Sequence, residues 1–288
     1  MTNLNRRTFM KTSVGAVAAS LMYTGASQAE VKALTATTPR TLGKTGITTS
    51  LLGMGTGTRA WKKDSAQIRR GEDVFVGTIA HAYEQGLRYF DLADMYGSHQ
   101  YMTKAMKKAA MKRDELTLLT KTVSKTAEAV QADVDLFLKE LETDYLDIVL
   151  LHCMTKGDWD VTFAPCMEVL AKAKEQGKIR AVGVSCHNLD AMKTAAELDW
   201  VDVMLSRINP FGVRMDGTPE EVTAVLKTAH ANGKGMLGMK ILGEGKMADK
   251  IDESLAFVLG LGCIDVINVG FLAQSEVDDT VRRIAAVG

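Results

Sequence analysis

The segment YFDLADMYG, residues 89–97, starts as an apolar run and ends in two carboxylates and a phenol. Asp91 closes the apolar part, and Tyr96 follows five residues later. Two further apolar runs end in a similar way, LLTKTV (118–123) with Lys121 and IVLLHC (148–153) with His152. A charged group inside an apolar run costs free energy unless it is paired, so we expect Asp91 and Lys121 to form an ion pair.

These four side chains suit proton transfer to a carbonyl oxygen. A free tyrosine has a pKa near ~10, and we expect the Lys121 ammonium to lower the pKa of Tyr96. His152 is expected to hydrogen-bond the same substrate oxygen and fix its position. No Cys or Ser nucleophile is evident beside them, so hydride from a nicotinamide is the natural partner reaction.

Parallel strands that alternate with helices would bring these residues together. Eight short apolar runs recur from about residue 50 onward, and segments with helical periodicity separate them. The expected strands are 50–55, 88–93, 116–123, 146–153, 179–185, 201–206, 235–242 and 264–271. This rhythm predicts an α/β fold, a (β/α)8 TIM barrel whose strands end at one active-site rim. An open doubly wound sheet is the alternative, but an early G-x-G-x-x-G after a first strand is missing. Residues 40–50 are expected to form a short hairpin that plugs the bottom of the barrel.

Residues 40–285 resemble the aldo-keto reductases. The segment 89–97 looks like that family's Asp-to-Tyr segment, and Lys121 and His152 match the rest of its catalytic tetrad. The resemblance implies a barrel that binds NADPH or NADH in extended form and reversibly reduces aldehydes or ketones to alcohols. It also implies roles: Tyr96 as the acid, Asp91 and Lys121 tuning it, and His152 orienting the carbonyl.

The same resemblance implies a set of cofactor-binding residues. Gly55 and Thr56 are expected near the nicotinamide, Ser185 at its carboxamide, and a glycine-rich loop at 242–247 near the pyrophosphate, where Lys246 adds charge. Segment 270–280 resembles the adenosine-binding loop. The complete expected set is Gly55, Thr56, Ser185, Gly243, Gly245, Gly270 and Asp279.

The chain departs from the family pattern at several of these places. Cys186 stands where an Asn usually follows Ser185. Leu205 and Ile208 occupy the places expected for a Gln and for a Tyr that stacks under the nicotinamide. Leu272 and Ala273 stand where a Lys or Arg commonly holds the 2′-phosphate of NADPH.

The first 29 residues have the features of a secretory signal. Paired arginines, Arg6 and Arg7, precede an apolar stretch at 14–22, and Ser27–Ala29 supplies small residues for cleavage. We expect a twin-arginine signal peptide at 1–29, a barrel domain at 30–288, the twin-arginine export machinery as a partner, and a periplasmic or otherwise exported protein. The apolar stretch is too short for a stable membrane anchor.

Composition excludes other classes of protein. Lys and Arg number 35, Asp and Glu also 35, so nothing attracts nucleic acid. The four cysteines include no C-x-x-C pair, and no metal site is expected. Cys153 and Cys186 are the pair to test for a disulfide, although free thiols are favoured because twin-arginine cargo folds before export.

Two other functions remain open on the sequence alone. Lys121 at a barrel mouth would suit Schiff-base chemistry in a lyase, although a partner carboxylate opposes the depressed pKa that such a lysine needs. The departures at the cofactor positions also leave open a non-catalytic barrel that only binds a ligand. The sequence gives no indication of the carbonyl substrate or the oligomeric state.

Overall fold

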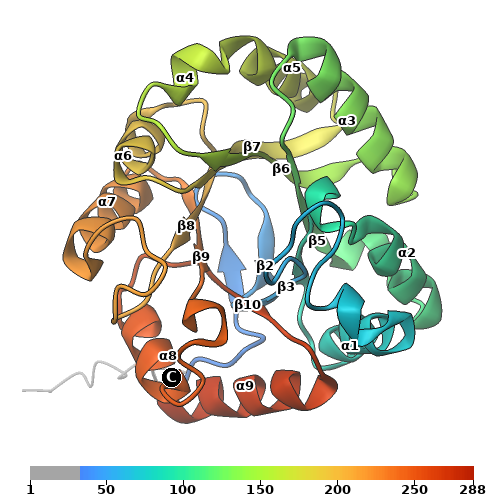
Figure 1. Ribbon diagram of the computed structural model, residues 1–288, viewed down its shortest axis with the longest axis vertical. Helices are drawn as coiled ribbons and strands as arrows, with labels where there is room; N and C mark the ends of the chain where they lie inside the picture. The colour runs from blue at the N-terminus through green and yellow to red at the C-terminus, as the bar shows by residue number, and fades with distance from the viewer. Residues whose placement is uncertain (1–32) are drawn as a thin grey trace, which may run out of the picture. The chain divides into compact units, whose positions relative to one another are not determined.

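Eight parallel strands close into a barrel in the computed structural model, which describes residues 33–288 (Figure 1). The barrel order is β10-β3-β4-β5-β6-β7-β8-β9, and every neighbouring pair is parallel. The strands are β3 (Leu52–Gly55), β4 (Tyr89–Asp91), β5 (Thr117–Thr122), β6 (Leu146–Met154), β7 (Ile179–Cys186), β8 (Val203–Arg207), β9 (Gly235–Met239) and β10 (Val266–Gly270). The predicted (β/α)8 barrel is confirmed, and each strand lies within or close to its expected run.

The helices surround the barrel and cover the outer face of its strands (Figure 1). They are α1 (Glu72–Glu84), α2 (His99–Lys108), α3 (Ala127–Glu140), α4 (Trp159–Thr162), α5 (Ala164–Glu175), α6 (Leu189–Glu197), α7 (Pro219–Ala231), α8 (Ile251–Gly260) and α9 (Gln274–Val287). Short 3₁₀ segments lie in the connections: η1 (Ile68–Arg70), η2 (Asp94–Tyr96), η3 (Arg113–Glu115) and η4 (Gly243–Gly245).

Local sequence explains where these helices start and which face they bury. Thr218 caps α7, since its hydroxyl accepts from Glu221 N at 3.2 Å while the Glu221 carboxylate accepts from Thr218 N at 2.9 Å. On α3, Val130, Val134 and Phe137 are buried on one side, as their spacing predicts.

Alternation along the strands divides the core into two parts. One set of side chains points outward and packs against the helices. The other set fills the barrel and includes Tyr89, Leu119, Leu150, Leu205 and Leu237, each with 1% or less of its surface exposed. Because side chains alternate between faces, the residue two positions beyond each of these also points into the barrel.

A hairpin closes the barrel at the N-terminal ends of its strands, as predicted. β1 (Pro39–Thr41) and β2 (Thr48–Ser50) pair antiparallel. Between them, Leu42 and Ile47 are fully buried in the barrel-filling cluster. Gly43 has φ +48°, and a side chain there would overlap the main chain at Gly233, so a residue without a Cβ fits this close approach.

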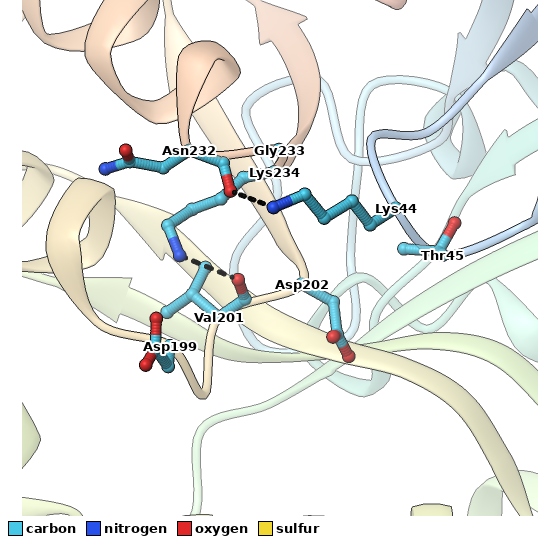
Figure 2. Close-up of a pocket in the computed structure, with 8 residues that line it drawn as sticks. All are labelled: Lys44, Thr45, Asp199, Val201, Asp202, Asn232, Gly233 and Lys234. Atoms are coloured by element: carbon cyan, nitrogen blue, oxygen red, sulfur yellow. Dashed lines mark hydrogen bonds between the residues drawn. The ribbon is translucent and has the colours of Figure 1, made fainter.

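A shallow hollow lies beside the hairpin at this closed end (Figure 2). It has a volume of about 230 Å³, and two lysines project into it. Lys234 Nζ donates to the carbonyls of Leu198 and Val201 at 2.8 and 3.1 Å, and Lys44 Nζ donates to Asn232 O at 3.3 Å. These contacts tie loops together, and the strand ends with the candidate catalytic residues lie at the opposite end.

The expected signal peptide lies outside the described residues. Within residues 33–288, no helix has the length and apolar character needed to cross a membrane. The same residues contain no group of three or more His, Cys, Asp or Glu side chains that would hold a metal ion. All four cysteines, including Cys153 and Cys186, are free thiols.

Candidate active site

The polar mouth of the barrel follows from the inward register of its strands. Leu119 and Leu150 belong to the cluster that fills the barrel, so Lys121 and His152, two residues later, point the same way one layer higher. Tyr89 places Asp91 by the same rule. The three strands β4, β5 and β6 are neighbours in the barrel, which brings the three side chains together.

Three further residues of this layer were missed in the sequence. Val266, Leu205 and Leu237 fill the barrel, and Asn268, Arg207 and Met239 follow them by two positions. The signal that would have found them is the same two-residue step past an inward apolar side chain, applied to strands β8, β9 and β10.

A buried ion pair occupies the base of the site. Lys121 is 1% exposed and Asp91 4%. The ammonium donates to Asp91 Oδ1 and to Leu92 O, the latter at 2.9 Å. Asn268 Nδ2 donates to the other carboxylate oxygen of Asp91 at 2.5 Å. The expected pairing of Asp91 with Lys121 is present, and Asn268 completes it.

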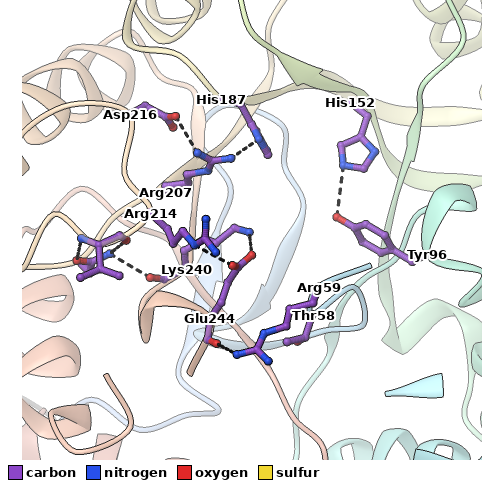
Figure 3. Close-up of polar contacts among 12 residues, drawn as sticks. Thr58, Arg59, Tyr96, His152, His187, Arg207, Arg214, Asp216, Lys240 and Glu244 are labelled. Atoms are coloured by element: carbon purple, nitrogen blue, oxygen red, sulfur yellow. Dashed lines mark hydrogen bonds and ion pairs between the residues drawn. The ribbon is translucent and has the colours of Figure 1, made fainter. Parts of the chain in front are cut away.

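Tyr96 lies directly above this pair. Its hydroxyl is 3.4 Å from His152 Nε2, and the two rings meet edge to face with centroids 5.5 Å apart (Figure 3). Lys121 Nζ is 4.6 Å from the centroid of the Tyr96 ring. Gly57 packs against the Tyr96 ring, and a Cβ at this position would overlap the ring. The four side chains singled out in the sequence therefore meet around one point.

The electrostatics of this group differ from the sequence expectation. Burial raises the pKa of Tyr96 well above its usual value, and the nearby Asp91 carboxylate raises it further. We expected the pKa of Tyr96 to be lowered by Lys121, but burial and the Asp91 carboxylate dominate, and the net shift is upward. Burial, and then Lys121, holds the pKa of His152 well below its usual value. Both groups are thus neutral near pH 7, and the phenol keeps its proton.

A groove extends from Tyr96 to the start of α9. Its volume is about 440 Å³, and its walls come from the ends of β3, β4 and β10, the loop after β9, and α9. Of the expected cofactor residues, Gly55, Gly245, Gly270 and Asp279 line it.

The other three expected cofactor residues lie outside the groove wall. Thr56 is fully buried, and its hydroxyl donates to Asp91 O at 2.8 Å. Ser185 Oγ accepts from Cys153 N at 2.7 Å. Gly243 is buried against Val213 and Met247. Each has a structural contact that explains its position.

Positive charge gathers on the loop after β9 and on the facing loop after β3. Lys240 and Arg59 line the groove, and Glu244 lies between them. The Glu244 carboxylate accepts from Lys240 and, at 3.2 Å, pairs with Arg214, while Arg59 donates to Glu244 O at 3.2 Å (Figure 3). Lys246, the cation expected from the sequence, is absent from the wall formed by the described residues.

Two carboxylates line the far end of the groove. Glu276 lines it and accepts from Leu272 N at 2.7 Å. Asp279 also lines it, but its carboxylate pairs with Arg282 and, at 2.6 Å, with Arg283. These two arginines hold the pKa of Asp279 below its usual value.

Leu205 on β8 and Ile208 just after it lie elsewhere than the family pattern predicts. Leu205 fills the barrel interior, and Ile208 is buried in the outer core. Neither lines the groove. Met239, at the end of β9, does so instead, and its side chain carries a polarisable thioether.

Comparison with known proteins agrees with this geometry. The family model described as "Aldo/keto reductase family" matches residues 52–258. L-galactose dehydrogenase of Arabidopsis thaliana is 28% identical over 223 residues, which cover 73% of this chain and 67% of that enzyme. Methylglyoxal reductase DkgB of Salmonella typhi is 30% identical over 130 residues, 44% of this chain, and the match spans about half (48%) of the relative's length.

Solved structures share the fold at lower identity. An aldo-keto reductase of Bombyx mori, in complex with NADP, superposes with a TM-score of 0.64 and 18% identity, covering 86% of this chain and 91% of that one. Its likeness supports the barrel architecture, and the matched family model spans all the strands that carry the tetrad. The chain belongs to the aldo/keto reductase family.

Proposed function

We propose that this protein reduces a small aldehyde or ketone to the alcohol with hydride from NADPH or NADH, and that Tyr96 gives the proton. The observation that carries the proposal is the position of the Tyr96 hydroxyl. It lies 3.4 Å from His152 Nε2, above the Lys121–Asp91 pair, at the inner end of the groove.

The groove fits an extended dinucleotide in several respects. Glycines at 55, 245 and 270 leave backbone accessible along it, and Lys240 and Arg59 supply charge for a pyrophosphate. Asn268 Oδ1 is buried without a hydrogen-bond partner among the described residues, so an acceptor is available beside the tetrad. When bound, the reduced nicotinamide supplies the hydride.

The tetrad residues divide the remaining work. Neutral Tyr96 donates its proton to the carbonyl oxygen as negative charge develops there. His152 hydrogen-bonds the same oxygen and sets its position. The Lys121 ammonium, held 4.6 Å from the ring centroid, stabilises the phenolate that remains. Asp91 and Asn268 keep the ammonium in place.

The two alternative functions are not favoured. A Schiff-base lysine must be free to attack, whereas Lys121 is buried and bound to Asp91 and Leu92 O. A barrel that only binds a ligand would not need the assembled tetrad or a groove that begins at its proton donor.

Replacing Tyr96 with Phe tests the proton donor. The phenyl ring keeps its contacts with His152, Lys121 and Gly57 and loses only the hydroxyl. We expect the reduction rate to fall about 10²–10⁴-fold, while NADH binding, measured by fluorescence titration, is unchanged. Tyr101→Phe on α2 is the matched control. Full turnover by Tyr96→Phe would show that the proton comes from elsewhere.

The pH dependence follows from the raised pKa of Tyr96. A group whose pKa is well above about 10 stays protonated at lower pH, so kcat for reduction should be level from pH 6 to 9. The reverse reaction needs the phenolate, and its rate should rise with pH over the same window. Steady-state rates in both directions check this. A reduction rate that declines between pH 6 and 9 would contradict the assignment.

The position of Glu276 at the far end of the groove favours NADH over NADPH. Glu276 can accept hydrogen bonds from ribose hydroxyls but repels a 2′-phosphate, and Leu272 supplies no cation there. We expect NADH to bind at least about tenfold more tightly than NADPH. Glu276→Arg should reduce or reverse this preference for NADH. Glu253→Arg, the same charge change at an exposed residue of α8, should leave the preference unchanged. Tighter binding of NADPH by the unaltered protein would refute the preference.

We also propose export by the twin-arginine route, on the evidence of Arg6, Arg7 and the apolar stretch that follows. Replacing both arginines with lysine should retain the protein in the cytoplasm, as measured by cell fractionation, while Lys11→Gln should leave export intact. The retained protein should bind cofactor as the exported one does. Release of the double variant into the periplasm would exclude this route.

A further inference from the structure

Arg207, at the end of β8, is a cation that belongs to neither the tetrad nor the groove wall. Leu205 fills the barrel, and Arg207 follows it by two residues at the end of β8. Among the described residues, the groove wall includes Lys240 and Arg59 but not Arg207. Arg207 thus lies outside the dinucleotide groove.

Arg207 faces Tyr96 from the far side of the mouth. In the closed order of strands, β8 lies four places from β4, which is the opposite side of an eight-stranded barrel. Figure 3 shows Arg207 with His187 and Asp216 on one side of the opening and Tyr96 with His152 on the other. A small molecule in the mouth would lie between the two groups.

The hydrogen bonding of the Arg207 guanidinium is incomplete. Nη1 donates to Asp216 Oδ1 at 3.0 Å and Nη2 donates to His187 Nδ1. Nε is buried and has no acceptor among residues 33–288, and the second oxygen of its partner, Asp216 Oδ2, is likewise buried and has no donor there. The guanidinium has five N–H donors, and the hydrogen bonds of the described residues use one on Nη1 and one on Nη2, so a second N–H on each terminal nitrogen is left for a ligand in the mouth.

His187 adds a second donor. Its Nδ1 accepts from Arg207, and burial followed by the Arg207 charge lowers its pKa to about 3. The ring is therefore neutral and carries its hydrogen on Nε2. That N–H has no protein acceptor among the hydrogen bonds of the described residues.

We propose that Arg207 and His187 bind a carboxylate of the substrate, so that the enzyme acts on aldehydes or ketones that also carry an acid group. The inference rests on the proposed carbonyl reduction and names its substrate class. The planar guanidinium matches a carboxylate in shape and charge. With the acid held on the β8 side, the carbonyl end of the molecule is directed toward Tyr96 and His152.

Matched acid and amide substrates test the proposal. The pairs are succinic semialdehyde with 4-oxobutanamide, and 4-carboxybenzaldehyde with 4-formylbenzamide, each reduced by the full-length protein with NADH and with NADPH. We expect kcat/KM for the acid of at least one pair to exceed that of its amide by about tenfold or more, chiefly through KM.

The variant is Arg207→Gln combined with Asp216→Asn, because removing the arginine alone leaves a buried carboxylate without its partner. The double variant should bring acid and amide to similar kcat/KM while reduction of the amide changes little. Lys108→Gln, which removes the charge of an exposed residue on α2, should retain the preference for the acid. A purely structural role for Arg207 would lower both rates together.

Two results would overturn the inference: equal use of acid and amide in both pairs, or an acid preference that the double variant retains. If no aldehyde is reduced with either cofactor, the proposed carbonyl reduction is wrong. Ligand binding then tests the carboxylate site independently. Equilibrium dialysis with 4-(hydroxymethyl)benzoate and its amide should then show selective binding of the acid that the double variant loses. Absent or unselective binding would exclude the site.

Discussion

The ion pair between Lys121 and Asp91 is the constraint on which the mouth of this barrel depends. An ammonium inside a closed sheet is tolerated only with a carboxylate and further hydrogen bonds, and Asp91, Leu92 O and Asn268 supply them. Because β4, β5 and β10 each contribute one of the side chains, the pair requires these strands to stay in register. Its position also fixes where the Tyr96 ring can rest, since the ring lies over the ammonium.

For the chemistry, the consequence is that the deep part of the site is charged, whereas the groups that meet the substrate are neutral. Asp91 and Lys121 neutralise one another below, while Tyr96 and His152 are neutral above, because burial disfavours their charged forms. A carbonyl oxygen that reaches these neutral groups meets a phenol that still holds its proton. As the proton leaves, the phenolate that forms lies beside the Lys121 ammonium, which attracts the phenolate more strongly than it attracts the neutral phenol. The arrangement therefore favours the transition state over the resting phenol.

The barrel, the closing hairpin and the clustering of the tetrad could be predicted from the sequence, because each follows from a pattern within a short segment. Apolar runs separated by helical periodicity fix the strand number, and a polar residue inside such a run is conspicuous. Asn268, Arg207 and Met239 obey the same two-residue step but were missed. Arg207 and Met239 end their strands, where polar or flexible residues are ordinary, and Asn268 is an uncharged side chain within β10. Their importance depends on which strands are neighbours or opposite, and closure of the barrel decides that.

The groove residues mark where sequence reasoning fails for a physical reason. A glycine-rich loop predicts backbone that can approach a phosphate, but it does not say which carbonyls and side chains turn inward. Gly245 lines the groove and Gly243 does not, and the cations come from Lys240 and Arg59 instead of Lys246. Ion pairing adds a second uncertainty, because Asp279 lines the groove while its carboxylate binds Arg282 and Arg283.

The tetrad is assembled although residues 205 and 208, at and just after β8, differ from the family pattern. Leu205 on β8 packs in the barrel interior at a position where a polar side chain was expected, so this position offers no polar contact to a ligand in the mouth. The next inward residue on the same strand is Arg207, so the polar contact has moved one layer outward and gained a charge. On β9 the neighbouring inward residue is Met239, whose flexible thioether can adapt to a flat ring. Arg207 and Met239 are register partners on β8 and β9, so this part of the rim offers a charge to a substrate acid directly next to an apolar surface for a flat ring.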